Sequence, residues 1–510
     1  MNCCRLWLSV ALVVFGISAA SGQSSNAPLL QQHWFEVRTV HFNIFSCGNP
    51  DDVRKLATKL EQFCESYALL TSARAVESPP IVVMAFPDEE SMKPFLPLYQ
   101  GQPANLAGFF QRGENENLIV LALPGSNSAQ TGMEVVFHEY THLLMRRYDA
   151  IWPLWLKEGM AEVYSTFEVS GGYHVFVARP IDHHLELLAN EPLMPLRELF
   201  AVNHDSPQYN ERTLQGIFYA ESWLLTDFLV AGDNPTFKAR FGQFTTLLSR
   251  GEPPEQAFTN ALQTTLPEVE AELHAYLQRG RFTPVELTLP ADVSAPAMSA
   301  SSAIPPVLVY YRLGDELMRI GRFDDAKNYF AQAQKLFPAS PLPYEGLGLL
   351  AAEQNQHEDA IKNLAESLQH GSTDFLTHYV YASEKYQLTA DSQGRYTPLK
   401  GEDASEIRDE LRKSIALMPN FGPSRELLGF FETVQGENLP EAEKQLQLAI
   451  ELEPENLACQ FSLAQAQFRN REPAAARSTL KPLLLPYVDA RLRNDATDLM
   501  HEINQEFPAN

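Results

Sequence analysis

Residues 135–144 of this 510-residue chain read VVFHEYTHLL, and residues 155–162 read WLKEGMAE. The apolar residues on both sides of the first HEYTH segment predict a buried helix, which places His138 and His142 four positions apart on one face. Two imidazoles with this spacing can hold one Zn²⁺ ion. Glu139 stands next to the first histidine, where the HExxH arrangement has the carboxylate that takes a proton from zinc-bound water. The segment therefore predicts a catalytic zinc site.

The third zinc ligand is expected from the second segment. A catalytic zinc ion usually has three protein ligands and keeps one position for water. Glu158 and Glu162 lie one helical turn apart, so both can face the two histidines. One of them is predicted to bind the metal. The other is predicted to accept a hydrogen bond from the second nitrogen of a histidine ligand and so fix its ring. Spacing alone leaves the assignment of the two roles open.

The residues before this site predict a small mixed sheet. Together with the HExxH helix they form a predicted α+β part, residues 33–180. The edge of such a sheet can pair with an extended peptide or can simply close the domain, and the sequence leaves both possibilities open. The patterns are those of strands at 34–45 and 81–86, a helix at 51–70 between them, and a hairpin of 106–110 with 118–123.

The residues after the site read first as helices and then as a linker. Residues 181–282 show helical periodicity, and we assign them to the same domain as the zinc motif. Residues 283–306 contain five prolines among alanines and serines. Because few of these residues could build a core, the segment predicts an interdomain linker.

Beyond that segment, a pattern of aromatic, small and apolar residues recurs after 34 positions. This spacing resembles tetratricopeptide (TPR) repeats, whose helix pairs stack into a solenoid. We expect residues 307–510 to form four or five such units, closed by a helix near residues 489–507. A solenoid of this kind normally binds peptide segments of protein partners, although it can also act as a rigid spacer. The matched residues are Tyr310, Leu313, Gly314, Ala326 and Phe330, which recur as Tyr344, Leu347, Gly348, Ala360 and Leu364.

The zinc motif and the helix that follows it resemble a peptidase family. HExxH followed by Trp-x-x-Glu-Gly-x-Ala, here residues 155–161, is similar to the gluzincin metallopeptidases of the peptidase MA-like group, which are related to the zinc aminopeptidases. The resemblance implies a thermolysin-like α+β zincin fold for the catalytic domain. It also implies that Glu158 is the third zinc ligand, which leaves the supporting role to Glu162.

The same resemblance implies a tyrosine that stabilises the oxyanion of peptide hydrolysis. Tyr219 opens a predicted helix at a comparable distance from the zinc motif and is the candidate, with Tyr164 and Tyr209 as alternatives. His183 and His184 also follow the site in sequence. They are left without an assigned role, because the metal already has its ligands.

The charge and the first residues of the chain bear on its partners and location. With 39 basic and 64 acidic residues the net charge is −25, which argues against nucleic acid as a partner. Residues 1–22 read as a cleavable signal peptide, too short for a stable membrane span, with a short membrane anchor as the alternative. A secreted or periplasmic protein is expected. There, a bridge between Cys47 and Cys64 is conceivable, and burial as free thiols is the alternative, as for Cys459.

Together these features predict a secreted or periplasmic zinc metallopeptidase that carries a TPR interaction domain. One Zn²⁺ ion is its cofactor and a peptide or protein its substrate. Two other classes stay open, namely a catalytically weak or inactive scaffold that binds peptides or protein partners, and a hydrolase of another bond. The predicted metal ligands are His138, His142 and Glu158, and the predicted catalytic residues are Glu139 and Tyr219.

Overall fold

The chain forms two compact units, one ending at Ile304 and the other beginning at Pro305. The predicted signal peptide, residues 1–22, lies outside the described residues. Within the described part of the chain, no helix is both long enough and apolar enough to cross a membrane. The computed structural model describes residues 27–71, 81–99, 101–104, 106, 108–113, 115–123, 129–145, 152–210, 212–290, 296–392, 394–454, 456–485 and 488–508.

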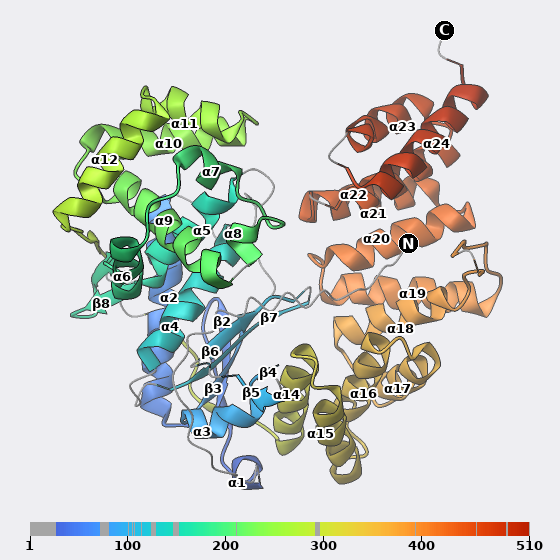
Figure 1. The fold of residues 1–510 in the computed structure, drawn as a ribbon. Helices are drawn as coiled ribbons and strands as arrows, with labels where there is room; N and C mark the ends of the chain where they lie inside the picture. The colour runs from blue at the N-terminus through green and yellow to red at the C-terminus, as the bar shows by residue number, and fades with distance from the viewer. Residues whose placement is uncertain are drawn as a thin grey trace. The chain divides into compact units, whose positions relative to one another are not determined.

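A six-stranded mixed sheet lies at the centre of the first unit (Figure 1). Its strands are β1 Phe35–Arg38, β2 Phe42–Ser46, β3 Ile81–Phe86, β6 Gly108–Gln111, β7 Asn117–Ala122 and β11 Ser302–Ala303. The order across the sheet is β11-β1-β2-β3-β7-β6, with parallel pairing of β2 to β3 and of β3 to β7 and antiparallel pairing elsewhere. The two edges are therefore formed by β11 and β6.

Two of the strand predictions are confirmed and one needs correction. Residues 81–86 form β3, and the predicted hairpin is the antiparallel pair of β6 and β7. The prediction of a single strand over residues 34–45 is wrong, because the chain turns back after β1. The backbone N–H of Thr39 donates to the carbonyl oxygen of Phe42 at 2.9 Å, and the N–H of Phe42 donates to Thr39 Oγ1 at 3.1 Å. This turn makes β1 and β2 an antiparallel hairpin.

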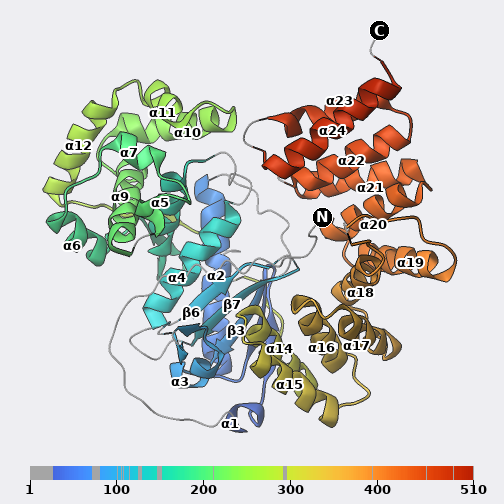
Figure 2. The same ribbon diagram turned by 45° about the vertical axis from the view of Figure 1, so that its right-hand side comes forward.

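Helices cover both faces of the sheet. On one face lie α2 (Pro50–Thr71) and α4 (Ala129–Leu144), where the rings of Phe63 and Phe137 stack with centroids 4.4 Å apart (Figures 1 and 2). On the other face, α3 (Glu89–Met92) leads into the short helix η1 (Lys93–Phe95), and Phe95 stacks on Phe86 at 5.2 Å. Because both faces are buried, β3 and β7 are continuous apolar runs rather than alternating patterns.

Helix α5 (Leu154–Ser165) carries the second motif and packs tightly on α9 (Arg212–Val230). Gly159 allows this approach, since a Cβ atom there would lie only 2.2 Å from the carbonyl oxygen of Ser222 and 2.1 Å from Oγ1 of Thr226. The helical periodicity predicted over residues 181–282 is confirmed. Its other helices are α6 Asp182–Asn190, α7 Leu196–Ala201, α8 Pro207–Asn210, α10 Pro235–Ser249, α11 Pro254–Leu262 and α12 Leu266–Arg279.

The segment predicted as a linker, residues 283–306, contributes strands to the first unit. β10 (Val285–Thr288) pairs with β9 (His174–Val177), which pairs in turn with β8 (Glu168–Ser170) to form a second sheet. β11 closes one edge of the large sheet by pairing with β1. The prediction of a free linker is therefore wrong for these strands. Three small elements complete the first unit: α1 Ala27–Leu30, β4 Leu98–Tyr99 and β5 Gln102–Pro103.

The second unit is a stack of helix pairs, coloured yellow to red in Figure 1. Its five successive pairs agree with the upper end of the predicted four or five units. The helices are α14 Pro306–Arg319, α15 Phe323–Leu336, α16 Leu342–Glu353, α17 His357–Gln369, α18 Phe375–Gln387, α19 Glu402–Leu417, α20 Gly422–Gln435, α21 Leu439–Leu452, α22 Leu457–Arg469 and α23 Pro473–Leu480, then η3 Lys481–Leu484 and the closing α24 Ala490–Glu506.

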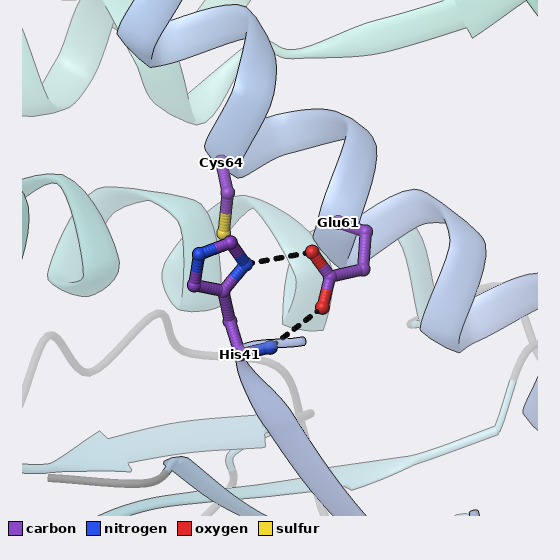
Figure 3. A group of neighbouring side chains, drawn as sticks. All are labelled: His41, Glu61 and Cys64. Carbon is purple, nitrogen blue, oxygen red and sulfur yellow. Dashed lines mark hydrogen bonds and ion pairs between the residues drawn. The ribbon is translucent and has the colours of Figure 1, made fainter. Parts of the chain in front are cut away.

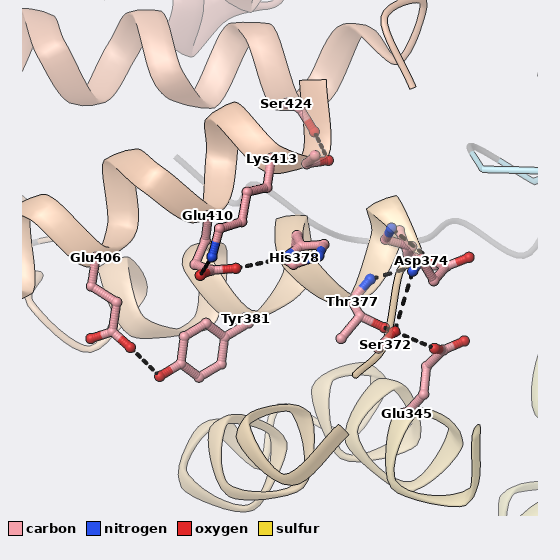
Figure 4. Close-up of polar contacts among 12 residues, drawn as sticks. Glu345, Ser372, Asp374, Thr377, His378, Tyr381, Glu406, Glu410, Lys413 and Ser424 are labelled. Carbon is pink, nitrogen blue, oxygen red and sulfur yellow. Dashed lines mark hydrogen bonds and ion pairs between the residues drawn. The ribbon is translucent and has the colours of Figure 1, made fainter. Parts of the chain in front are cut away.

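Small residues and polar contacts hold these helices together. A Cβ atom on Gly314 would lie 2.5 Å from the Phe330 ring, so the helices of the first pair approach closely at this glycine. Further along the stack the contacts are polar (Figure 4). The Tyr381 hydroxyl donates to the Glu406 carboxylate at 2.7 Å, and His378 Nδ1 lies 2.5 Å from the carboxylate of Glu410. The solenoid is thus stabilised by packing and by hydrogen bonds between neighbouring helices.

Candidate metal centre

Helices α4 and α5 bring together three side chains of the kinds that can bind a metal ion. His138 and His142 share one face of α4, and Glu158 of α5 meets them. His142 Nε2 lies 3.2 Å from His138 Nε2 and 3.2 Å from Glu158 Oε2. His138 Nε2 lies 3.5 Å from the same carboxylate oxygen. The ligand atoms of a tetrahedral zinc ion, with bonds of about 2.0–2.2 Å, are about 3.3 Å apart. The three atoms therefore have the spacing that one Zn²⁺ ion requires.

These three side chains are enclosed on one side and reachable on another. The side chains of His138 and Glu158 are 9% and 5% exposed, whereas that of His142 is 26% exposed. A structural zinc site is closed by protein ligands, whereas a catalytic site keeps one position accessible. The partial exposure of His142 fits the second kind of site.

The charges around the centre suit a cation. Burial opposes ionisation of Glu158, but the imidazoles of His142 and His138 outweigh it and lower the pKa of this carboxyl to about 2. Burial likewise opposes protonation of His138, yet Glu162 and Glu158 raise the pKa of its imidazole well above the usual value. The carboxylates therefore attract positive charge to this position, and a bound metal ion would replace the proton.

Glu139 stands beside the ligands on α4 and is half-buried. Burial raises the pKa of its carboxyl, an effect that the imidazoles of His138 and His142 oppose. A carboxylate whose pKa lies closer to neutral is a better proton acceptor than an exposed glutamate. Its position and its environment both fit a general base.

The structure distinguishes the two glutamates of α5. Glu158 belongs to the ligand group, whereas Glu162 Oε1 lies 3.4 Å from His138 Nδ1, the ring nitrogen that is not among the close ligand atoms. This placement favours Glu158 as the ligand and Glu162 as the carboxylate that holds the ring. Glu162 also reaches His184 of α6, whose Nε2 lies 3.3 Å from Glu162 Oε2. Sequence reasoning missed His184, because no local motif marks a contact made across helices.

Two of the three candidate tyrosines lie near the centre. The Tyr219 ring on α9 has its centroid 6.2 Å from that of His138, and the Tyr209 ring of α8 stacks on Tyr219 at 6.3 Å. Burial, followed by the charge of Glu158, raises the pKa of Tyr209 to about 12 and that of Tyr219 still further, so both phenols remain donors. Tyr164 instead packs in the core and is no longer a candidate.

A second group of possible ligands, His41, Glu61 and Cys64, has a different geometry (Figure 3). His41 Nδ1 lies 2.7 Å from Glu61 Oε2, and the His41 backbone N–H donates to Glu61 Oε1 at 2.8 Å. The first distance is shorter than the roughly 3.3 Å between ligands of tetrahedral zinc and typical of a charge-assisted hydrogen bond. We interpret the pair as a hydrogen-bonded contact that holds the β1–β2 turn against α2.

The three cysteines in the described part of the chain form no disulfide bridge. Cys47, Cys64 and Cys459 are all free thiols, so the conceivable Cys47–Cys64 disulfide is absent. The alternative of buried free thiols is confirmed for Cys64 and Cys459, whereas Cys47 is half-buried. Burial raises the pKa of Cys47 to about 12 and that of Cys64 well above the usual range. The Cys64 thiol lies 2.9 Å from the hydroxyl of Tyr140 on α4, so it takes part in core packing.

Comparison with known proteins concerns the second unit. A family model described as tetratricopeptide repeat matches residues 311–374 and 434–481. Similar solved structures include YrrB, a TPR protein with an unusual peptide-binding site (16% identity, 38% of this chain and 92% of that chain, TM-score 0.32). Others are a thermophilic TPR protein from Thermus thermophilus (20%, 38% and 99%, 0.27) and PilF of Pseudomonas aeruginosa (16%, 40% and 93%, 0.30). A search of the curated proteins found no match. The family model confirms the repeats predicted from the 34-residue spacing, and residues 311–374 and 434–481 are tetratricopeptide repeats.

Proposed function

We propose that the first unit is a zinc-dependent peptidase of the gluzincin type, with thermolysin-like construction. The observation that carries the proposal is the triangle of His138, His142 and Glu158, whose ligand atoms lie 3.2–3.5 Å apart with Glu139 beside them. These three residues would hold the metal. When bound, Zn²⁺ supplies a Lewis acid that lowers the pKa of water and polarises the scissile carbonyl group.

The other residues of the site have separate proposed roles in peptide hydrolysis. Glu139 accepts a proton from the attacking water and passes it to the leaving amine. Tyr219, which keeps its phenolic proton, donates a hydrogen bond to the developing oxyanion, and Tyr209 stacks behind it. Glu162 holds the ring of His138 through Nδ1.

A peptide or protein substrate is favoured by the edge of the sheet next to the centre. Strand β6 pairs with β7 on one side and packs against α4, the helix that carries the zinc motif. In the described part of the large sheet, β6 is the terminal strand on this side. An extended peptide can add to such an edge through main-chain hydrogen bonds, which would lay its backbone beside the metal ligands.

We also propose a secreted or periplasmic location, from the signal-like residues 1–22. The TPR repeats then supply a surface for a protein partner, which can be the substrate itself or a protein that directs the peptidase to its substrate.

The test combines metal analysis with hydrolysis of a mixed peptide library by the full chain. We expect about one Zn²⁺ per chain and cleavage that a chelator abolishes. Glu139→Gln should lower the rate by about 10²-fold or more while zinc remains. The matched control is Glu134→Gln, an exposed glutamate on the same helix, which should leave cleavage unchanged. A wild-type protein that binds no zinc would overturn the proposal.

The second candidate function is a scaffold that binds peptides or protein partners without turnover. It is favoured by the comparison with known proteins, since the family match is to an interaction repeat. A scaffold predicts a zinc-loaded protein that captures a partner through its repeats and cleaves no peptide of the library. In that case wild type and Glu139→Gln would behave alike, so the same experiment separates the two functions.

A further inference from the structure

The carboxylate of Glu162 contacts two imidazoles, and only one of them belongs to a proposed zinc ligand. Its Oε1 lies 3.4 Å from His138 Nδ1, and its Oε2 lies 3.3 Å from Nε2 of His184. His138 belongs to α4, Glu162 to α5 and His184 to α6. One carboxylate thus joins two imidazoles from separate helices, and each of its oxygens faces a different ring.

His184 occupies a well-defined place in the core. Its side chain is 5% exposed, and its ring centroid lies 5.9 Å from that of Trp223 on α9. Both of its ring nitrogens are buried, and neither makes a hydrogen bond of regular geometry with the described residues. Nε2 nevertheless faces the Glu162 carboxylate, at the ion-pair distance of 3.3 Å. A buried N–H without an acceptor costs more than an unpaired ring nitrogen, so the imidazole places its proton on Nε2, facing the carboxylate. A protonated Nε2 would attract the carboxylate of Glu162 across this 3.3 Å contact.

We propose that His184 is a positioning residue for the zinc ligand His138 and acts through Glu162. The inference rests on the proposed zinc site. A carboxylate held by one imidazole can turn about its terminal bond, whereas a second donor on the other oxygen fixes its plane. The fixed carboxylate then sets the tautomer and the ring orientation of His138. The residue therefore contributes to metal affinity and touches neither metal nor substrate.

Zinc affinity of the full chain, measured by competition with a chromogenic chelator, tests this role. His184→Leu fills similar space without a donor and should weaken zinc binding about tenfold. His184→Gln can place its amide N–H₂ near the position of Nε2 and should restore most of the affinity. A residue that only fills space would give the reverse order, since Leu packs better in an apolar site. His274→Leu, at an exposed histidine of α12, is the control and should change nothing.

A double-mutant cycle tests whether the effect passes through Glu162. Glu162→Ala alone should weaken zinc binding by about 10- to 100-fold. Adding His184→Leu to Glu162→Ala should then cause no further loss. Additive losses, or wild-type affinity in His184→Leu, would overturn the inference. The affinity measurement uses no substrate, so its result stands even if the zinc-loaded protein cleaves no peptide. A wild-type protein that binds no zinc would overturn both this inference and the proposed peptidase.

Discussion

At the scale of single residues, the two glutamates of α5 have equivalent places in the helical spacing. Their positions in the folded structure nevertheless favour different roles. Glu158 and Glu162 lie one turn apart, and both approach His138. Glu158 faces the Nε2 side of that ring, where His142 also points, and Glu162 faces Nδ1. Helical spacing does not distinguish the two carboxylates, and only the resemblance of residues 155–161 to a peptidase motif implies that Glu158 is the ligand. The side from which α5 approaches α4 decides the matter, and that is a property of the fold.

Replacing each glutamate by alanine should separate these roles. Glu158→Ala removes a ligand, so zinc should be lost on dialysis against a chelator. Glu162→Ala leaves all three ligands in place, so zinc should remain, with an affinity lower by about 10- to 100-fold. Zinc content and competition titration measure both effects. If Glu162→Ala loses more zinc than Glu158→Ala, the roles are reversed.

Gly159 lies where α5 packs closely on α9. A Cβ atom here would meet the Ser222 carbonyl oxygen at 2.2 Å, and backbone yields less readily than a side chain. Gly159→Ala should therefore lower the free energy of unfolding by about 1–3 kcal/mol, measured by denaturant titration.

The matched control is Gly242→Ala on α10. That glycine is exposed within a helix, and an added Cβ would meet nothing within 4 Å. Here alanine should raise the free energy of unfolding by up to about 1 kcal/mol, because glycine is the poorer helix former. A similar loss of stability at both positions would show that close packing is not the cause.

At the scale of elements, helices could be predicted from the sequence far better than strands. Helical periodicity is local, so α2, α4 and the repeat helices are recognisable from their own residues. Strands β8 to β11 were not predicted, because their stability comes from partners elsewhere in the chain. The pairing of Glu36 with Ser302 is an example, since the residues around Ser302 look like a linker on their own.

Helix α16 offers a prediction about pH. Burial, followed by the charge of Asp374, raises the pKa of Glu345 to about 8 from an ordinary 4.5. The Tyr311 hydroxyl donates to its Oε1 at 2.5 Å. Ser372 Oγ donates to its Oε2 at 3.2 Å (Figure 4). Since the folded pKa is raised, the stabilisation is complete below about pH 4.5 and is lost as the pH rises through 8. The repeat unit should therefore unfold more easily at pH 9 than at pH 5.

Glu345→Gln tests the origin of this dependence. A neutral amide keeps an acceptor for Tyr311 and never ionises, so the variant should melt at a higher temperature than wild type at pH 9 and at nearly the same temperature at pH 4. Glu358→Gln, at an exposed position at the start of α17, is the control and should follow the wild-type profile. Melting curves by circular dichroism at several pH values supply the measurement. Parallel profiles for Glu345→Gln and wild type would assign the pH dependence to another group.

At the scale of the whole molecule, the sequence predicted two units of different construction but misplaced the boundary between them. The candidate metal ligands could be found because HExxH and the following Glu-Gly segment are compact motifs on two successive helices. The contact of His184 with Glu162 could not be predicted, since it joins α6 to α5 only after the chain has folded. The boundary was misplaced for a related reason, because residues 283–304 look polar and proline-rich until their pairing partners are known.

This boundary leads to a prediction about truncated proteins. A chain ending at Ile304 keeps β10 and β11, which pair with β9 and β1. A chain ending at Phe282 loses both strands and leaves the N–H and C=O groups of two strand edges unpaired. We expect the first to be monomeric and to retain zinc. The second should melt at a lower temperature and aggregate, because exposed strand edges associate. Size-exclusion chromatography, melting curves and zinc analysis compare the two, and equal behaviour would mean that residues 283–304 act only as a linker.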